Sequence, residues 1–250
     1  MYGKKIKSYL LLIMVLTVQM AFGQLKGMMI YLSDGNIVKL AVSQIDSINF
    51  KNNVVDIDSN VYKIIQIGDQ CWLAENLKVT HYRNGDPIPN VTDATEWNAL
   101  TTGAYCNYDN NSSNAEIYGR LYNWFAVTDS RNIAPEGWHV PSDAEWDTLV
   151  NYLGGFDVAG GKLKATGTTY WASPNEGATN ESGFTALPAG LRGYNGTFGS
   201  LVEGYSALFW SSTECDGGSA WRRALYYGHD DINRYNDNKP WGFSVRLVRD

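Results

Sequence analysis

Residues 135–155 read PEGWHVPSDAEWDTLVNYLGG, and this stretch carries the signals for a helix from its start to its end. Ser142 is followed three residues later by Glu145, the pattern of a capping box, in which each side chain bonds the backbone amide of the other residue. Gly154-Gly155 suits the left-handed turn that ends many helices. Between these signals, apolar residues recur at the spacing of one helix face: Trp146, Leu149, Val150 and Leu153. The stretch therefore predicts an amphipathic helix that packs against the rest of its domain.

Two more helices are predicted before it. Asp93 and Glu96 form a second capping box, which opens a short helix that presents Trp97 on one side. A second main helix is predicted over residues 117–127, because four aromatic or apolar residues there repeat the helical spacing: Tyr118, Leu121, Tyr122 and Phe125. The centre of the chain is thus expected to hold two main helices.

Short strands are predicted on both sides of these helices. Hairpins are expected at Asp34-Gly35 and at Asp58-Ser59-Asn60, since such residues tolerate the positive φ that tight turns need. Gln70 to Leu73 begins another strand. Beyond residue 160, Gly, Asn, Ser and Thr interrupt every apolar run, and three strands stand out: residues 184–191, 207–211 and 243–248. The last alternates apolar and polar residues, which predicts a half-buried strand. The fold class is therefore α+β and loop-rich, with small antiparallel sheets.

The first 23 residues have the pattern of a secretory signal peptide: Lys4, Lys5 and Lys7, an apolar run over residues 9–18, and Ala21-Phe22-Gly23. The run is shorter than the ~20 residues that a membrane span needs, so no retained transmembrane segment is expected. The protein is therefore predicted to be secreted or held at the cell surface. Its predicted organisation is a signal peptide (1–23), a small N-terminal β element (24–53) and one main domain (54–250).

Charge and cysteine content narrow the classes of function. Without the signal peptide the chain carries 17 basic and 26 acidic residues, a formal charge of −9, which disfavours a nucleic-acid partner. Cys71, Cys106 and Cys215 are the only cysteines, so at most one disulfide can form within the chain. The sequence has no Cys-x-x-Cys pattern, and it therefore gives no support to a structural zinc site or a thioredoxin-type redox role.

Six blocks of sequence occur in an order that resembles a known family: QIGDQCWLAENLK (66–78), AYCNY (104–108), YGRLYNW (118–124), GWHVPS (137–142), ESGFTALPAG (181–190) and GFSVR (242–246). Together they resemble the Fibrobacter succinogenes major paralogous domain over residues 54–250. That family is similar in turn to the C-type-lectin-like fold in its formylglycine-generating-enzyme variety. The resemblance implies two central helices, small twisted antiparallel sheets, and first and last strands that lie close together.

The resemblance also bears on the cysteines. Family members commonly carry one cysteine just before the Pro-x-Gly-Trp-His block and another in the last strand, where this chain has Ala134 and Leu247. Both are missing together, as expected if the two normally form a disulfide. A substitute bridge between Cys71 and Cys215, which are unusual for the family, is then an open alternative.

The sequence gives little support for catalysis. Formylglycine-generating enzymes use paired cysteines late in the domain, and only Cys215 lies there. There is no Gly-x-Ser-x-Gly elbow, no carboxylate pair stands out, and His81, His139 and His229 stand alone in the sequence. We therefore expect a non-enzymatic module. Two alternatives stay open: a cryptic enzyme on a formylglycine-generating-enzyme-like scaffold, and a structural component of the cell surface.

No cofactor is expected, with calcium as the one candidate ion. The polar segment 107–116 offers oxygen ligands of the kind calcium prefers, above all Asp109, Asn111 and Glu116. Their spacing is not that of an EF-hand, and the Glu-Pro-Asn and Gln-Pro-Asp triplets of calcium-dependent lectins are absent. The alternative is an ordinary solvated loop.

Residues 203–241 concentrate aromatic and charged side chains, a combination suited to recognition of sugars or protein surfaces. The predicted partner is an extracellular polysaccharide or protein. The candidate ligand-binding residues are Trp221, Arg222, Tyr226, Tyr227, Asp230, Arg234 and Tyr235. In the alternative interpretation these rings belong to the core, and Trp210 and Trp241 are assigned to it.

Overall fold

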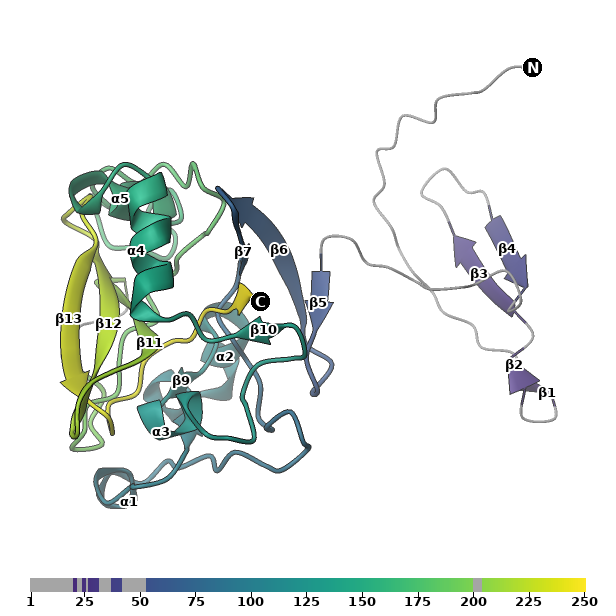
Figure 1. Ribbon diagram of the computed structural model, residues 1–250, viewed down its shortest axis with the longest axis horizontal. Helices are drawn as coiled ribbons and strands as arrows, with labels where there is room; N and C mark the ends of the chain where they lie inside the picture. Colours follow the sequence, from purple (N-terminus) through teal and green to yellow (C-terminus); the bar gives the residue numbers. More distant parts are fainter. Residues whose placement is uncertain (1–19, 22–23, 26, 32–36, 42–52, 200–203) are drawn as a thin grey trace. The chain divides into compact units, whose positions relative to one another are not determined.

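The computed structural model describes residues 20–21, 24–25, 27–31, 37–41, 53–199 and 204–250 (Figure 1). The chain divides into two compact units, Met1–Lys51 and Asn52–Asp250. Most of the predicted signal peptide and the end of the N-terminal β element lie outside the described residues. Among the helices that the structure describes, none combines the length and the apolar character needed to cross a bilayer.

The first unit contains two pairs of antiparallel strands. β1 (Met20–Ala21) pairs with β2 (Gln24–Leu25), and β3 (Gly27–Tyr31) pairs with β4 (Ile37–Ala41). The second pair confirms the strands of the first predicted hairpin, whose Asp34-Gly35 turn lies outside the described residues.

A five-stranded antiparallel sheet forms one side of the second unit. Its strand order is β10-β14-β7-β6-β5, with these bounds: β5 (Asn53–Val55), β6 (Val61–Ile67), β7 (Gln70–Leu73), β10 (Trp138–His139) and β14 (Val248–Arg249). The β5–β6 hairpin turns through Ser59 at φ 67°, which confirms the second predicted hairpin. Val248 of β14 pairs with Trp72 of β7, so the last strand lies beside the first strands of the domain, as the resemblance implies.

A three-stranded antiparallel sheet forms the other side. It consists of β11 (Ser206–Asp216), β12 (Ser219–Tyr226) and β13 (Asn233–Asn238), with β13 at the edge. A two-stranded sheet, β8 (Tyr105–Cys106) with β9 (Leu121–Tyr122), lies lower in Figure 1. The predicted strand at 207–211 is confirmed and extends to Asp216. β13 was not predicted, because the sequence NRYNDN has no apolar alternation.

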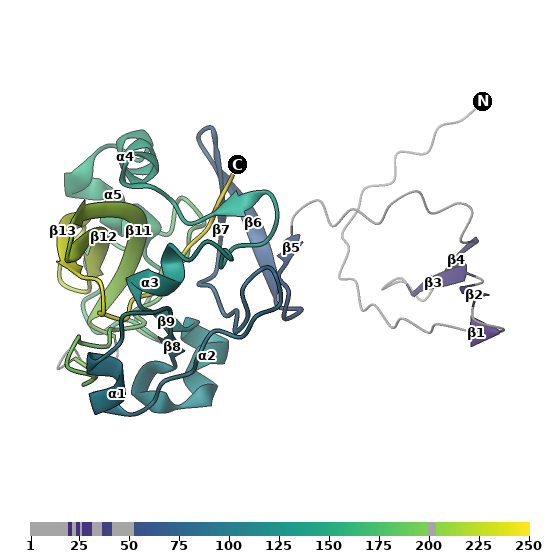
Figure 2. The same ribbon diagram turned by 60° about the horizontal axis from the view of Figure 1, so that its bottom comes forward.

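Five α-helices occur in the described part of the chain: α1 (Ala94–Asn98), α2 (Ser112–Tyr118), α3 (Trp124–Val127), α4 (Asp143–Tyr152) and α5 (Phe156–Leu163). A 3-10 helix covers Tyr108–Asn110. Figures 1 and 2 both show α4 lying against the three-stranded sheet, with α5 next to it. The capping box of α4 is present, since the Ser142 hydroxyl accepts from the Glu145 amide and the Glu145 carboxylate accepts from the Ser142 amide.

Packing of α4 joins the two sheets. Trp146 is fully buried, with its ring centroid 4.9 Å from that of Trp72 on β7 and 5.7 Å from that of Phe209 on β11. Burial of each large apolar side chain contributes about 1.5–3 kcal/mol, whereas a helix cap contributes about 1 kcal/mol. The cap therefore sets where α4 begins, and the buried face supplies most of its stability.

The prediction of one helix over residues 117–127 is wrong. The chain leaves α2 at Gly119, which has φ 76° and lies so close to Asn76 that an added Cβ would be 2.6 Å from the Asn76 Cβ. Tyr122 then pairs with Tyr105 in the small sheet and with Phe243 in an isolated bridge. The helical spacing of apolar residues thus reflects burial in three successive short elements.

Two strand predictions need correction. Residues 184–191 form no strand and make only a parallel bridge between Ala186 and Lys164. Of residues 243–248 only Val248 belongs to a strand, and the segment is not half-buried, since each residue is at most 1% exposed. This segment runs between the two sheets: the Leu247 carbonyl accepts from Leu73 of β7, and the Ser244 carbonyl accepts from Trp210 of β11. Polar residues in the alternation are therefore buried as fully as apolar ones.

Candidate functional site

The predicted ligand-binding residues lie on β12, on β13 and in the loop between them. Directly opposed residues of an antiparallel pair project from the same face, and the face alternates along the strand. The register pairs Arg222 with Tyr235 and Arg223 with Arg234. The candidates are consequently divided between the two faces of the sheet, and they do not form one site.

Trp221 and Arg234 lie on the face that meets α4. The Arg234 guanidinium carbon is 3.4 Å from the centroid of the Trp221 ring, a cation–π contact. Arg234 Nη2 also donates to Asp143 Oδ2 at 2.7 Å, while the buried Arg223 donates to Asp143 Oδ1 at 2.6 Å. Burial acts to raise the pKa of Asp143, but the hydrogen bonds from the two arginines outweigh it and lower that pKa. Trp221 and Arg234 are thus engaged in anchoring β13 to the start of α4.

Arg222 and Tyr235 lie on the opposite face, in a row of side chains in which Arg222 links the Tyr235 ring to that of Phe243. The Arg222 guanidinium carbon lies 5.1 Å from the Tyr235 ring centroid and 5.3 Å from that of Phe243. The row continues from Phe243 to Trp241 at 5.8 Å and from Trp241 to Tyr194 at 6.0 Å. Tyr235 is 45% exposed and Tyr194 is 49% exposed. We call Tyr194, Arg222, Tyr235 and Trp241 the aromatic surface.

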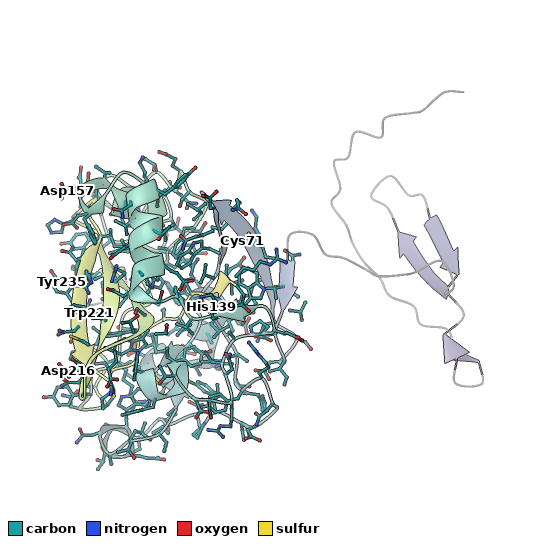
Figure 3. All side chains as sticks on the ribbon, viewed as in Figure 1. Cys71, His139, Asp157, Asp216, Trp221 and Tyr235 are labelled. Carbon is teal, nitrogen blue, oxygen red and sulfur yellow. The ribbon has the colours of Figure 1, made fainter. Side chains whose placement is uncertain are left out.

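Figure 3 shows Tyr235 and Trp221 at the left edge of the domain. Two residues of the aromatic surface were not among the sequence candidates. Tyr194 stands in the turn Gly193-Tyr194-Asn195-Gly196, and an aromatic residue between turn-forming glycines was the available signal. Trp241 was interpreted as structural; it is half-buried, packs against the core cluster that contains Phe243, and also contacts Tyr194.

The remaining candidates lie elsewhere. Tyr226 is four residues along β12 from Arg222, or about 13 Å at roughly 3.3 Å per residue. Tyr227 packs on Tyr205 with ring centroids 4.6 Å apart. Asp230 is exposed, and its carbonyl accepts from the Gly161 amide of α5. These three residues are not part of the aromatic surface.

The calcium candidates have separate partners. Asn111 Oδ1 accepts from the Ser113 amide and caps α2, whereas the Glu116 carboxylate lies 4.0 Å from the Lys78 ammonium. Asp109 is exposed in the 3-10 helix. Within the ranges that the structure describes, no group of three or more His, Cys, Asp or Glu side chains is placed to hold a metal ion. Calcium binding at 107–116 stays a prediction.

The suggested disulfide between Cys71 and Cys215 is not formed. The Cys71 thiol donates to Gln66 Oε1 at 2.7 Å, and the Cys215 sulfur accepts from Asn236 Nδ2 at 3.1 Å. Cys71 belongs to the five-stranded sheet and Cys215 to the three-stranded one. Figure 3 shows Cys71 well to the right of Asp216, the neighbour of Cys215. All three cysteines are free thiols.

Two histidines that stand alone in the sequence have carboxylate partners in the structure. His81 Nδ1 lies 2.5 Å from Asp58 Oδ1, and His139 lies between Asp250 and Glu145. Both ring nitrogens of His139 are hydrogen-bonded to carboxylates, which leaves neither of them to act as a base.

Comparison with known proteins places this architecture in a family. No curated protein and no solved structure matches the chain. The family model of the Fibrobacter succinogenes major domain matches residues 65–249, which include all of the second unit from the middle of β6 into β14. The match covers well over half of the sequence, so the chain belongs to the Fibrobacter succinogenes major domain family.

Proposed function

We propose that the protein is an exported, non-enzymatic binding module of C-type-lectin-like fold that recognises a polysaccharide, or alternatively a protein, at the cell surface. The observation that carries this proposal is the aromatic surface, whose partly exposed rings are linked through Arg222 and the buried Phe243. The adjacency of the first and last strands of the domain supports the fold. The sequence pattern of residues 1–23 supports export.

The chemistry of the aromatic surface favours a polysaccharide as the ligand. Aromatic rings cover the apolar faces of sugars and lose little conformational entropy on binding, because each has only two side-chain torsions. Arg222 and its ion-pair partner Asp237 lie beside Tyr235 and supply the donors and acceptors that orient hydroxyl groups. Trp241 and Tyr194 extend the row of side chains beyond the length of one sugar unit, which suits a ligand made of several sugar units.

The test is a glycan array and affinity electrophoresis with soluble polysaccharides, using the chain without residues 1–23, in calcium and in a chelator. We expect Tyr235→Ala and Trp241→Ala each to weaken retention by about tenfold, since one aromatic contact contributes about 0.5–1.5 kcal/mol beyond its buried area. Tyr152→Ala is the matched control, because Tyr152 is a 65% exposed ring on α4. Retention should be unchanged in this variant.

Three results decide the proposal. Loss of retention in the two aromatic-surface variants alone supports it, and loss in the chelator would add calcium as a cofactor. Capture of a cell-surface protein that depends on the same two residues would make the ligand a protein. The absence of any retained ligand, or an equal loss in the Tyr152→Ala control, would overturn it.

A further inference from the structure

A cavity of about 280 Å³ lies between β6, the segment after β7, α2 and the loop at residues 183–187. Figures 1 and 2 both show β6 and β7 on the side of the domain away from β13, so this cavity is separate from the aromatic surface. Its volume falls near the lower end of small-molecule sites, which begin at roughly 300 Å³. It suits one molecule the size of a monosaccharide. The lining includes Lys63, Glu75, Lys78, Glu116, Thr185 and Arg246.

Arg246 lines the cavity although its residue is only 1% exposed. Its guanidinium donates to Asn76 Oδ1 at 2.6 Å and to the carbonyls of Leu73, Phe184 and Thr185 at 2.9, 2.7 and 3.1 Å. A guanidinium has five N–H donors, so one N–H on Nη2 has no acceptor among the described residues.

Arg246 forms no ion pair among the described residues, although Glu75 acts on its charge from a distance. No carboxylate in the described part of the chain hydrogen-bonds this guanidinium, and burial lowers the pKa of Arg246 to about 9, with Glu75 as the opposing charge. The group is therefore still charged at neutral pH. A buried charge is costly unless a partner of opposite sign accompanies it, so an anionic ligand would be favoured here.

The rim supplies both signs of charge. Lys78 Nζ donates to the Glu116 carbonyl at 2.8 Å, and the Lys63 amide donates to Glu75 Oε2 at 2.8 Å. Lys63 and Lys78 bring the lining cations to three against two carboxylates. The excess positive charge suits an acid, while the carboxylates can accept hydrogen bonds from hydroxyl groups of the same molecule.

The backbone beside Arg246 is strained. Thr185 has φ 54°, a left-handed conformation that a β-branched residue rarely adopts. Asn180 holds it there by accepting from the Thr185 amide at 2.8 Å, and the Thr185 carbonyl faces Arg246. Backbone strain of this kind is common at binding sites, where the surrounding contacts hold a residue in an unfavourable conformation.

We propose that this cavity binds a hydroxylated carboxylic acid of monosaccharide size, a uronic acid, with its carboxylate directed to Arg246 and Lys78 and its hydroxyls to Glu75. The acid is either free or the end residue of a polysaccharide. The proposal does not depend on the aromatic surface, and either can fail alone.

The test is isothermal titration of the chain without residues 1–23 with glucuronate, glucose and acetate. We expect glucuronate to bind at least about tenfold more tightly than glucose, which lacks the carboxylate, and than acetate, which lacks the hydroxyls. A uronic-acid oligosaccharide that binds through its end residue would identify the polysaccharide source, and binding of the free acid alone would identify the small molecule.

Variants at the rim test the location without disturbing Arg246, whose replacement would unfold the loop it holds. Ile117 lines the cavity and is 47% exposed on α2. Ile117→Glu should weaken glucuronate binding about fivefold and Ile117→Lys should strengthen it, through charge alone. Val158→Glu on α5, where Val158 is 40% exposed, is the matched control. Equal binding of glucuronate and glucose, or equal effects of Ile117→Glu and Val158→Glu, would overturn the proposal.

Discussion

His139 Nδ1 lies 2.6 Å from Asp250 Oδ1, and this hydrogen bond connects β10 to the last residue of the chain. The other ring nitrogen, Nε2, lies 2.8 Å from Glu145 Oε1 in the capping box of α4. Because carboxylates accept and do not donate when ionised, both ring nitrogens must carry protons. The imidazolium therefore joins β10, the start of α4 and the C-terminal residue. Figure 3 shows His139 beside the C-terminal strand.

The hydrogen bonds of His139 to the two carboxylates predict a loss of stability as the pH rises above about 6.5. Burial acts to lower the pKa of His139, but the hydrogen bonds to Asp250 and Glu145 outweigh it and raise that pKa above its usual value. A folded-state pKa above the unfolded one adds stability that is complete below the unfolded pKa of about 6.5 and is lost as pH rises through the folded value. We expect the Tm of the wild-type protein to fall over this window. Thermal unfolding from pH 5.5 to 9 measures it.

His139→Gln is the variant that tests the source of this pH dependence. A glutamine side chain keeps hydrogen-bonding capacity but does not titrate, so the Tm should become flatter over the same pH range. His229→Gln is the control, because His229 is an exposed histidine in the loop after β12. An unchanged slope in His139→Gln would show that another group carries the titration.

Lys164 is predicted to hold the second half of the domain together. It is fully buried, and its ammonium donates to the carbonyls of Glu176, Tyr226 and His229 at 2.7, 3.0 and 2.6 Å. Burial lowers the pKa of Lys164 to about 8, which leaves it mostly charged at pH 7. Lys164→Met takes the ammonium donor away from three carbonyls, so we expect a loss of about 2–4 kcal/mol in the free energy of unfolding. Urea denaturation gives this value.

Lys162→Met is the matched control. Lys162 is two residues earlier and partly exposed, and its ammonium lies 3.3 Å from the Glu181 carboxylate on the surface. Surface ion pairs of this kind contribute about 0–1 kcal/mol. Similar losses for the two lysine variants would argue against the carbonyl contacts as the source of stability.

Sequence patterns predicted elements whose signals are local. The capping box and apolar face of α4 lie within one stretch of 14 residues, from Ser142 to Gly155, and the β5–β6 turn needs only residues that tolerate positive φ. The failures have the opposite character. The predicted helix over residues 117–127 is interrupted at Gly119, whose backbone packs closely on Asn76. The burial of residues 243–248 depends on strands that are far away in the sequence. Long-range contacts decided these regions.

Only part of the candidate site was predicted, because its arrangement also depends on long-range contacts. Arg222 and Tyr235 were found because they are aromatic or charged in a loop-rich region, but the division of the candidates between two faces depends on the β12–β13 register. The sequence of β13 does not indicate a strand at all. Asp250, one partner of His139, is distant in sequence, and the partners of Lys164 are backbone carbonyls, which side-chain composition does not reveal.

The helix α5 was not predicted, because it contains two adjacent glycines, Gly160 and Gly161. An added Cβ on Gly160 would lie 1.8 Å from the Asp231 carbonyl oxygen, so the loop before β13 packs directly on the helix backbone. Replacing a helix glycine with alanine usually stabilises by up to about 1 kcal/mol. Here we expect Gly160→Ala to destabilise by about 3 kcal/mol, because backbone must move to admit the methyl group.

Gly217→Ala provides the comparison for Gly160→Ala. Gly217 lies in the β11–β12 turn, has no atom within 4 Å of an added Cβ, and is outside the left-handed region. Its replacement should change the free energy of unfolding by less than about 0.5 kcal/mol. Chemical denaturation of both variants in parallel tests the prediction, which a stabilised Gly160→Ala protein would contradict.

The three free cysteines should differ in their accessibility to alkylating reagents. Cys71 and Cys215 are half-buried, whereas Cys106 is fully buried and burial raises its thiol pKa to about 12. The thiolate is the reactive form, so Cys106 should resist alkylation in the folded protein. Mass spectrometry after iodoacetamide treatment without reductant should show two labels on the native protein and three in denaturant. Fewer than three labels in denaturant would reveal a disulfide, and labelling of a Cys71→Ser variant would show which thiol is involved.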